Sequence, residues 1–569
     1  MPNRIAECAP LDLLKKYSWI ILLATTLLIH GSNLFASWRF EDGYLLNNAA
    51  PYSPLLFFVD AEVSRQFSYA YITPWQGVFF HISAAINTPF WSYFLLLTII
   101  FLCALLTYHL LTRIISPELS LFACLFFLLS PGTVAIAGML MTAHYALGLL
   151  FFLITLATFS SKNRSLYMIS VVSFAFACLC KEIYIPLPIA LFFIFNGNLK
   201  NRIIKTMPFI LALAVYFLWR WHVLGSFLGS TAGNSGSPLP WESFFSQLVQ
   251  ALLGHGISAW ILLTIIAFII FSSLRMKIIN TQPNFFIIAT SLVLFLIPLF
   301  AIRRFGFDGL ATRYAFFPAW GLAIGLAYLC HHMQNTNKNI RTLTPIALLI
   351  FLIPSTFNYK SFLNEAARPM EQVYRALESS YNKETLIIVP SFSGTEYVAH
   401  YSDLQATNKP TTSAKLLKIE EDLFSINSSQ TVLIYNNECK CLKDNYLQAI
   451  KLRNDLINEL RSGVGRQWKG EVKFEMDHSL HSGKVVWQFE PWRDGHYEFR
   501  SDFLSINLPA AGSSRFGGSY AARPWRFYIR YRSPQGWAVQ TPWLLMPIAH
   551  DTKVIWDEKQ SCHSPWCKN

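Results

Sequence analysis

Two adjacent carboxylates, Glu41 and Asp42, stand just beyond the end of the first hydrophobic segment of the chain. A carboxylate held against an apolar surface loses hydration, which raises its pKa towards the range in which a general base works. Asp42 could therefore take the proton from an acceptor hydroxyl. Glu41 could orient the acceptor, hold a metal, or raise the pKa of its neighbour by like-charge repulsion. The alternative interpretation is that the pair only caps the loop and keeps it in water.

Several basic residues are expected at the same level of the membrane. Lys181 and Glu182 interrupt an apolar stretch, and Arg303, Arg304 and Arg313 lie between two late apolar segments. When a sugar leaves a lipid phosphate, negative charge grows on that phosphate, and Arg or Lys stabilises it. Two other interpretations stay open: a structural ion pair for the first two residues, and headgroup anchoring for the arginines.

Aromatic residues follow the carboxylates in the same loop. Tyr69, Tyr71 and Trp75 could form a platform for a sugar or a lipid headgroup, because such rings suit both water and lipid. They also fit an ordinary interfacial belt. Lone histidines such as His144 lack metal-site spacing, and we interpret them as packing residues.

The rest of the chain, which must position these residues, is strongly apolar. Of its 569 residues, 53% are hydrophobic and 14% charged, and an average soluble domain has about 25% charged residues. This composition predicts a multi-span membrane protein. The net charge of +13 does not indicate nucleic acid, because most Lys and Arg lie in short loops between apolar runs and set orientation there.

Eleven apolar segments are candidate spans: Tyr17–Phe35, Trp91–Leu111, Leu119–Leu129 extended towards Gly138, His144–Phe159, Leu166–Cys180, Ile183–Phe195, Met207–Val223, Leu248–Leu274, Phe285–Ile302, Tyr314–Leu329 and Leu343–Phe357. The third and sixth are short for the ~20 residues that cross a bilayer, which suggests re-entrant or broken segments. With a cytoplasmic N-terminus, every basic loop except one falls on the cytoplasmic side. The exception carries the three late arginines, on the outer side with Glu41 and Asp42, and this violation indicates function.

The last part of the chain, residues 358–569, is polar and lies outside after eleven crossings. Buried-strand patterns at Leu386–Val389 and Val432–Tyr435, with a helical pattern at Asn445–Leu460, predict an α/β part. Alternating stretches such as Lys484–Phe489 predict a small antiparallel β-sandwich after it. The expected fold is a polytopic α-helical membrane protein with a C-terminal soluble α/β plus β-sandwich domain, divided as residues 1–357 (first outer loop 36–90), 358–465 and 466–569.

Four cysteines of this outer region, Cys439, Cys441, Cys562 and Cys567, could form two disulfides, whose connectivity cannot be read from sequence. Their spacing also permits a zinc site, although closed structural zinc sites usually use C-x2-4-C pairs. No cofactor is assigned, and a divalent metal stays open.

Several motifs, in order, resemble membrane O-mannosyltransferases of the tetratricopeptide-repeat type. Phe40-Glu41-Asp42, followed by Asn47-Asn48, resembles their paired-acid loop, and Tyr71-Ile72-Thr73-Pro74 is similar to their Tyr-Arg-Pro-Leu segment. Leu179-Cys180-Lys181-Glu182 resembles their Lys-Glu motif, and Thr312-Arg313-Tyr314-Ala315-Phe316-Phe317-Pro318 resembles their Glu-Arg-x-x-Tyr-x-Pro element. The resemblance implies the wider GT-C superfamily, whose members take a sugar from a polyprenyl phosphate with inversion.

By this resemblance Asp42 is the base and Glu41 its partner. Lys181 and Arg313 become candidate ligands of the donor phosphate, with Arg303 and Arg304 as further candidates. Substrate contacts are expected from Tyr71, Trp75 and Glu182. Departures from the family are Glu41 in place of Asp, Ile72 in place of Arg and Thr312 in place of an acid. No tetratricopeptide repeats follow, so neither mannose nor a protein acceptor is implied.

We therefore expect a glycosyltransferase of a bacterial inner membrane, with a cytoplasmic N-terminus and a periplasmic C-terminal domain. Its partners would be a polyprenyl-phosphate-linked sugar, a glycan, lipid or protein acceptor, and membrane lipids. The alternatives are a transporter or flippase of lipid-linked sugars and a non-catalytic assembly protein. A transporter predicts charges at mid-membrane and repeated halves, whereas the charges here lie near span ends.

The orientation can be tested with reporters fused after Asn569. Because eleven crossings from a cytoplasmic start end outside, we expect a reporter active only in the periplasm to work there. Activity of a cytoplasm-only reporter at the same site would remove one crossing. It would also separate the C-terminal domain from the loop of Glu41 and Asp42.

Overall fold

The computed structural model describes residues 9–65, 67, 71–195, 197–225, 227, 240–254, 256–275, 309–332, 338–378, 385–388, 395–408, 415–417, 423, 426, 428–436, 438–439, 441–466, 468–477, 482–501, 505–517, 525–546 and 552–556. Several expectations lie outside these residues: Tyr69, Arg303, Arg304, the span Phe285–Ile302, Cys562 and Cys567.

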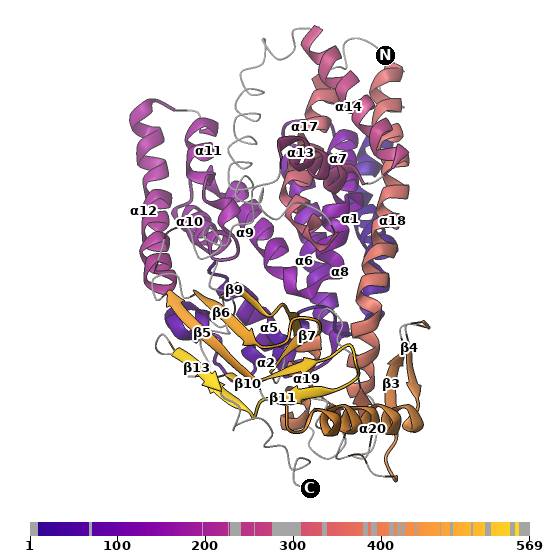
Figure 1. The fold of residues 1–569 in the computed structure, drawn as a ribbon. Coiled ribbons are helices and arrows are strands. Elements are labelled where there is room, and N and C mark those ends of the chain that lie inside the picture. Colours follow the sequence, from indigo (N-terminus) through magenta and orange to yellow (C-terminus); the bar gives the residue numbers. More distant parts are fainter. Residues whose placement is uncertain are drawn as a thin grey trace, which may run out of the picture.

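A bundle of long apolar helices forms the first part of the molecule (Figure 1). Among the described residues, 6 segments are long and apolar enough to cross a membrane, or up to 8 if each bent helix pair is one span. The helices that carry these six segments are α1 (Ala9–His30), α6 (Pro89–Leu111), α9 (Ala143–Phe159), α12 (Leu199–Leu224), α17 (Phe316–His332) and α18 (Lys338–Glu378). The chain is thus a multi-pass membrane protein.

The shorter predicted spans take other forms. The third is a pair of helices, α7 (Pro117–Leu129) and α8 (Pro131–Gly138), bent by 55°. The bend falls where Ser130 caps α8 and Pro131 starts it, because proline lacks the N–H that would continue α7. The eighth is a second bent pair, α13 (Trp241–Leu253) and α14 (Ile257–Arg275).

Two predicted spans correspond to short apolar helices. The fifth is α10 (Arg164–Cys178), and the sixth is the short η3 (Glu182–Tyr184) followed by α11 (Leu187–Ile194). Both fall below the length of a full span. Lys181 lies in the break between α10 and η3, and Glu182 is the first residue of η3.

The described part of the loop that follows α1, residues 36–90, is folded into the short helices α2 (Asp42–Ala49), α3 (Leu56–Val59), α4 (Ala61–Arg65) and α5 (Pro74–Ile86). Helix α2 packs against α19 (Thr395–Asn408), which belongs to the C-terminal region. Asn47 Nδ2 lies 3.3 Å from His400 Nδ1, and Tyr44 stacks edge-on against the same imidazole. The loop and the C-terminal region therefore lie at the same end of the bundle.

The C-terminal region begins with an α/β part, as its sequence pattern predicts. Strands β2 (Lys415–Leu417), β1 (Leu386–Ile388) and β3 (Val432–Asn436) run parallel, and β4 (Cys441–Asp444) pairs antiparallel with β3. Helix α20 (Tyr446–Gly463) follows, with Asn445 as its N-cap. Cys439 and Cys441 form a disulfide in the hairpin between β3 and β4.

Two antiparallel sheets follow, which also agrees with the sequence pattern. One has the order β13-β5-β6-β9, from β5 (Lys469–Asp477), β6 (Ser482–Glu490), β9 (Ala511–Gly517) and β13 (Thr552–Trp556). The other has the order β11-β10-β7-β8, with β12 also on β10, from β7 (His496–Ser501), β8 (Ser505–Leu508), β10 (Trp525–Arg532), β11 (Ala538–Gln540) and β12 (Leu544–Met546). One apolar core joins them, since Val472 and Phe489 pack with Tyr497 and Phe527.

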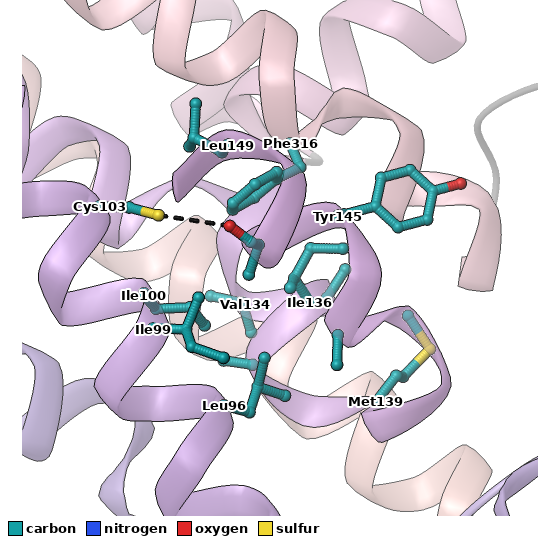
Figure 2. Packing of buried hydrophobic residues seen from close by; sticks show 14 of the residues in the cluster. Leu96, Ile99, Ile100, Cys103, Val134, Ile136, Met139, Tyr145, Leu149 and Phe316 are labelled. Carbon is teal, nitrogen blue, oxygen red and sulfur yellow. Dashed lines mark hydrogen bonds between the residues drawn. The ribbon is translucent and has the colours of Figure 1, made fainter. Parts of the chain in front are cut away.

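The main hydrophobic core runs through the bundle. Figure 2 shows Leu96, Ile99 and Ile100 of α6 against Val134 and Ile136 of α8. The same core continues into the C-terminal region, because Ile387 of β1 and Tyr401 of α19 belong to it. Packing therefore joins α19 to the membrane helices as one apolar interior.

One close approach joins α8 to η6 (Gly309–Ala315), the turn that carries Arg313. A Cβ on Gly132 would lie 2.8 Å from backbone atoms of Ala315 and Phe316. We expect Gly132→Ala to lower the stability of the purified protein by about 1–3 kcal/mol, because backbone cannot yield as a side chain does. Thermal unfolding in detergent measures this. Gly31→Ala is the control, since its Cβ would meet nothing nearer than 3.9 Å; equal losses in both variants would contradict the tight contact.

Candidate active site

A tight turn sets the position of the two carboxylates before α2. Phe40 has a φ of 47°, in the left-handed region that a bulky residue rarely adopts. The hydroxyl of Tyr374, on α18, donates to the Phe40 carbonyl at 3.1 Å and accepts from the Gly43 N–H at 3.1 Å. Asp42 closes the turn, because its Oδ2 accepts from the Arg39 N–H at 2.7 Å. The strained turn is therefore held by α18 and by Asp42 itself.

Arg39 ties this turn to the helices behind it. Its buried guanidinium pairs with Glu371, and it also donates to Asn364 Oδ1 at 3.1 Å and to the Gly138 carbonyl at 3.3 Å. These partners belong to α18 and α8. Sequence reasoning did not single out Arg39; its place directly before Phe40-Glu41-Asp42 was the available signal.

Asp42 is fully buried at 0% exposure. Desolvation raises the pKa of its carboxyl to about 8, the charge of Glu41 adds to this, and the N–H and charge of Arg39 oppose it. Oδ1 has no hydrogen-bond partner of full geometry, although the Met141 backbone lies close enough to lower the pKa somewhat. The carboxyl thus has one oxygen held and one oxygen available.

Lys181 projects from the break between α10 and η3 onto aromatic rings. Its Nζ lies 3.7 Å from the ring centroid of Tyr71 and 5.2 Å from that of Tyr145. Glu182 Oε2 is 4.0 Å from the same nitrogen. A cation over an aromatic face is held by the ring quadrupole, so Lys181 is positioned both by the Tyr71 ring and by a long ion pair with Glu182.

Glu182 has a closer partner in Arg220, near the end of α12. The two side chains pair at 2.6 Å, and Arg220 also contacts the Tyr216 hydroxyl at 3.2 Å. The ion pair expected between Lys181 and Glu182 is therefore the weaker of the two contacts that Glu182 makes. The role of Arg220 was not recognised from the sequence.

Arg313 reaches the cluster from η6. Its Nη1 donates to the Leu310 carbonyl at 3.0 Å, and its guanidinium lies 4.9 Å from the Tyr314 ring. Its electrostatic partners include Glu41, Tyr71 and Tyr145. Arg313 therefore belongs to the same group of side chains as the first outer loop.

Tyr71 lies at the centre of these residues. Burial raises the pKa of its phenol, the charge of Lys181 opposes the shift, and Glu41 is near enough to add to it. The structure thus brings Glu41, Tyr71, Lys181 and Arg313 together, with Asp42 next to Glu41.

Trp75 is separate from this group. Its ring packs with Phe58, Phe151 and Phe176 at centroid distances of 5.3, 5.2 and 5.0 Å. Among the described residues, its Nε1 is buried without a partner. Trp75 is partly buried in an aromatic cluster, and its contact with substrate stays a prediction.

The arrangement combines a buried carboxyl with a pKa near neutrality and two cations from different helical elements. It suits removal of a proton beside a developing anion. Among the described residues, no group of three or more His, Cys, Asp or Glu could hold a metal ion. No protein-family model and no curated protein matches this chain.

The ion pair of Glu182 and Arg220 can be tested by removing one partner. Arg220→Met leaves a largely buried carboxylate without its closest cation, and such a break costs about 3–5 kcal/mol. We expect a lower melting temperature for Arg220→Met and recovery of most of the loss in Arg220→Met/Glu182→Gln. If Arg220→Met melts like the original protein, Lys181 has moved to Glu182 and the pair is not a structural anchor.

Proposed function

We propose that this protein is a membrane glycosyltransferase that moves a sugar from a polyprenyl-phosphate donor to a periplasmic acceptor, with inversion and with Asp42 as general base. The observation that carries this proposal is the fully buried Asp42 carboxyl, whose pKa is raised to about 8 and whose Oδ1 has no hydrogen-bond partner of full geometry within the described part of the chain. An ordinary loop-capping aspartate keeps both oxygens in water or in hydrogen bonds.

The pKa of Asp42 suits proton removal near neutral pH. A base is most effective when its pKa lies close to the working pH, because enough of it is ionised and it still binds the proton well. Because Oδ2 already accepts a hydrogen bond from the Arg39 N–H, Oδ1 is the oxygen that would receive the proton. In this proposal Glu41 orients the acceptor and raises the pKa of its neighbour.

Lys181 and Arg313 support a lipid-phosphate donor. The two cations come from the α10–η3 break and from η6, and both meet Tyr71. A phosphate leaving the sugar gains negative charge in the transition state, which such cations stabilise more than they stabilise the substrate. Arg303 and Arg304 stay predictions, as does contact of Tyr71, Trp75 and Glu182 with substrate.

The acceptor would be presented by the C-terminal region. Helix α19 packs directly on α2, which begins with Asp42. An acceptor bound by this region would lie on the same side of the bundle as the base. We propose eleven crossings, a GT-C-like arrangement and a bacterial inner membrane as the setting, with the acceptor a glycan, a lipid or a protein.

The two alternatives account for less. A flippase needs charges along a path through the membrane, whereas Arg220 lies within one turn of the end of α12 at Leu224, and Lys181 lies at a helix break. A non-catalytic assembly protein has no use for a buried, half-satisfied carboxylate, which costs stability.

The direct test is sugar transfer by purified protein in lipid, with the donor identified from the lipid-linked intermediates that accumulate in a deletion strain. We expect Asp42→Asn to reduce turnover by about 10²-fold or more, since it keeps the size of the side chain and removes the base. Near-normal turnover in folded Asp42→Asn would overturn the assignment. Glu41→Gln is the matched comparison, and we expect it to retain more activity.

The pKa of Asp42 also predicts a pH dependence. Because the base must be ionised, transfer should rise with pH up to about 8 and fall about tenfold per unit well below it. Because the pKa of Asp42 is raised in the folded state, the folded protein holds this proton more tightly than the unfolded chain does, and protonation of Asp42 stabilises the fold. This contribution to stability is fully present below the ordinary pKa near 4 and is lost as the pH rises through 8. The melting temperature of Asp42→Asn, compared with that of the original protein at the same pH, should therefore rise between pH 5 and pH 9. The same pH profile of unfolding in both proteins would contradict the raised pKa.

A further inference from the structure

His144 is a buried side chain whose hydrogen-bonding capacity is not satisfied by the described residues. It stands in the first turn of α9 and is 2% exposed; the Met141 backbone approaches the ring, but neither ring nitrogen has a partner of full geometry among those residues. Leaving a buried polar group unsatisfied costs about 1–3 kcal/mol, so each such group needs an explanation. A ligand that supplies the missing partners is one.

The surroundings of His144 indicate the charge of that ligand. Its ring stacks on Tyr71 at 6.3 Å and lies 4.6 Å from Tyr145. The charged groups that act on it most are the cations Lys181 and Arg313. Two cations around an imidazole with unused nitrogens form a surrounding that suits an anion with hydrogen-bond acceptors.

The position relative to Asp42 adds a second constraint. The backbone of Met141 approaches the carboxyl of Asp42 and the ring of His144, and its carbonyl accepts from Gln76 Nε2 at 2.9 Å. Asp42 and His144 therefore both lie beside the backbone of Met141, in the turn before α9.

His30 provides a contrast within the same bundle. It is 0% exposed, and its Nε2 is paired with the Leu128 carbonyl at 3.0 Å. That contact satisfies one ring nitrogen by the fold alone. Only Nδ1 of His30 is left buried without a partner among the described residues, whereas both ring nitrogens of His144 are, and the Met141 backbone only approaches the His144 ring.

We propose that His144 completes, with Lys181 and Arg313, the site that holds the phosphate of the polyprenyl-phosphate sugar; this rests on the proposed function. A neutral imidazole has one donor nitrogen and one acceptor nitrogen. The first would donate to a phosphate oxygen, and the second would accept from a hydroxyl of the sugar. Lys181 and Arg313 already supply charge, so His144 contributes a directed hydrogen bond that positions the phosphate.

The experiment measures binding to the full-length protein in phosphatidylcholine nanodiscs. The probes are undecaprenyl phosphate, undecaprenol, phosphatidylglycerol and inorganic phosphate, which separate phosphate recognition from chain or headgroup binding. The variants are His144→Phe, which keeps the ring stack on Tyr71, His144→Gln, which keeps a donor and an acceptor, and the control His30→Phe. Thermal unfolding confirms that each protein is folded, and His144→Leu replaces His144→Phe if that variant does not fold.

We expect His144→Phe to weaken binding of undecaprenyl phosphate by about ten- to a hundredfold, the range of one hydrogen bond to a charged group. Binding of undecaprenol should not change. His144→Gln should recover at least half of the loss on a logarithmic scale, which a purely structural role would not produce. His30→Phe should bind like the original protein.

The failures are distinguishable. If the original protein does not prefer undecaprenyl phosphate over undecaprenol, the proposed function and this inference both fail. If it does, and Arg313→Ala weakens binding while His144→Phe does not, only the role of His144 is overturned. A further outcome is that phosphatidylglycerol or inorganic phosphate displaces undecaprenyl phosphate as well as undecaprenyl phosphate itself does, in a manner that depends on His144. That result would indicate a general phosphate site rather than a site for the sugar donor, and it would also overturn the inference.

Discussion

The buried guanidinium of Arg39 is the interaction on which the candidate site depends. It joins the turn before α2 to Glu371 and Asn364 of α18 and to the carbonyl that ends α8. A buried cation is costly unless it is paired and hydrogen-bonded. The several partners of the Arg39 guanidinium therefore fix the position of the turn that carries it. The strained backbone at Phe40 persists because Tyr374, one turn further along α18, holds the peptide groups on both sides of it.

The remaining charges follow the same constraint of desolvation. Glu182 meets Arg220, Lys181 lies on the Tyr71 ring, and Arg313 lies on Tyr314. Among the described residues, Asp42 Oδ1 and both ring nitrogens of His144 are buried without a hydrogen-bond partner of full geometry, and the Met141 backbone approaches both side chains. Because burial without a partner costs free energy, a ligand that supplied these partners would gain stability on binding.

The C-terminal region is part of this arrangement rather than an appendage. Helix α18 leaves the bundle and continues to Glu378, where its carboxylate accepts from Tyr401 of α19, which in turn accepts from the Trp38 indole. The Trp38 to Tyr401 contact lies just before the Arg39 turn. Contacts of α19 thus reach both Trp38, before the Arg39 turn, and α2, which begins with Asp42.

The sequence alone determined that this is a multi-pass membrane protein with a C-terminal mixed α/β and antiparallel-sheet region, and it predicted a desolvated carboxyl beside the first span. Apolar length and sparse charge require membrane helices, alternation predicts the two antiparallel sheets, and acids beside a span predict a desolvated carboxyl, because each of these depends on local periodicity and hydration. Only the tertiary structure decided the partners: Glu182 with Arg220 rather than Lys181, Trp75 in a packed aromatic cluster, and His144 beside Lys181 and Arg313. The reason is distance along the chain. Contacts such as Arg39 with Glu371 join residues hundreds of positions apart, and no local pattern encodes which helix faces meet when the bundle closes.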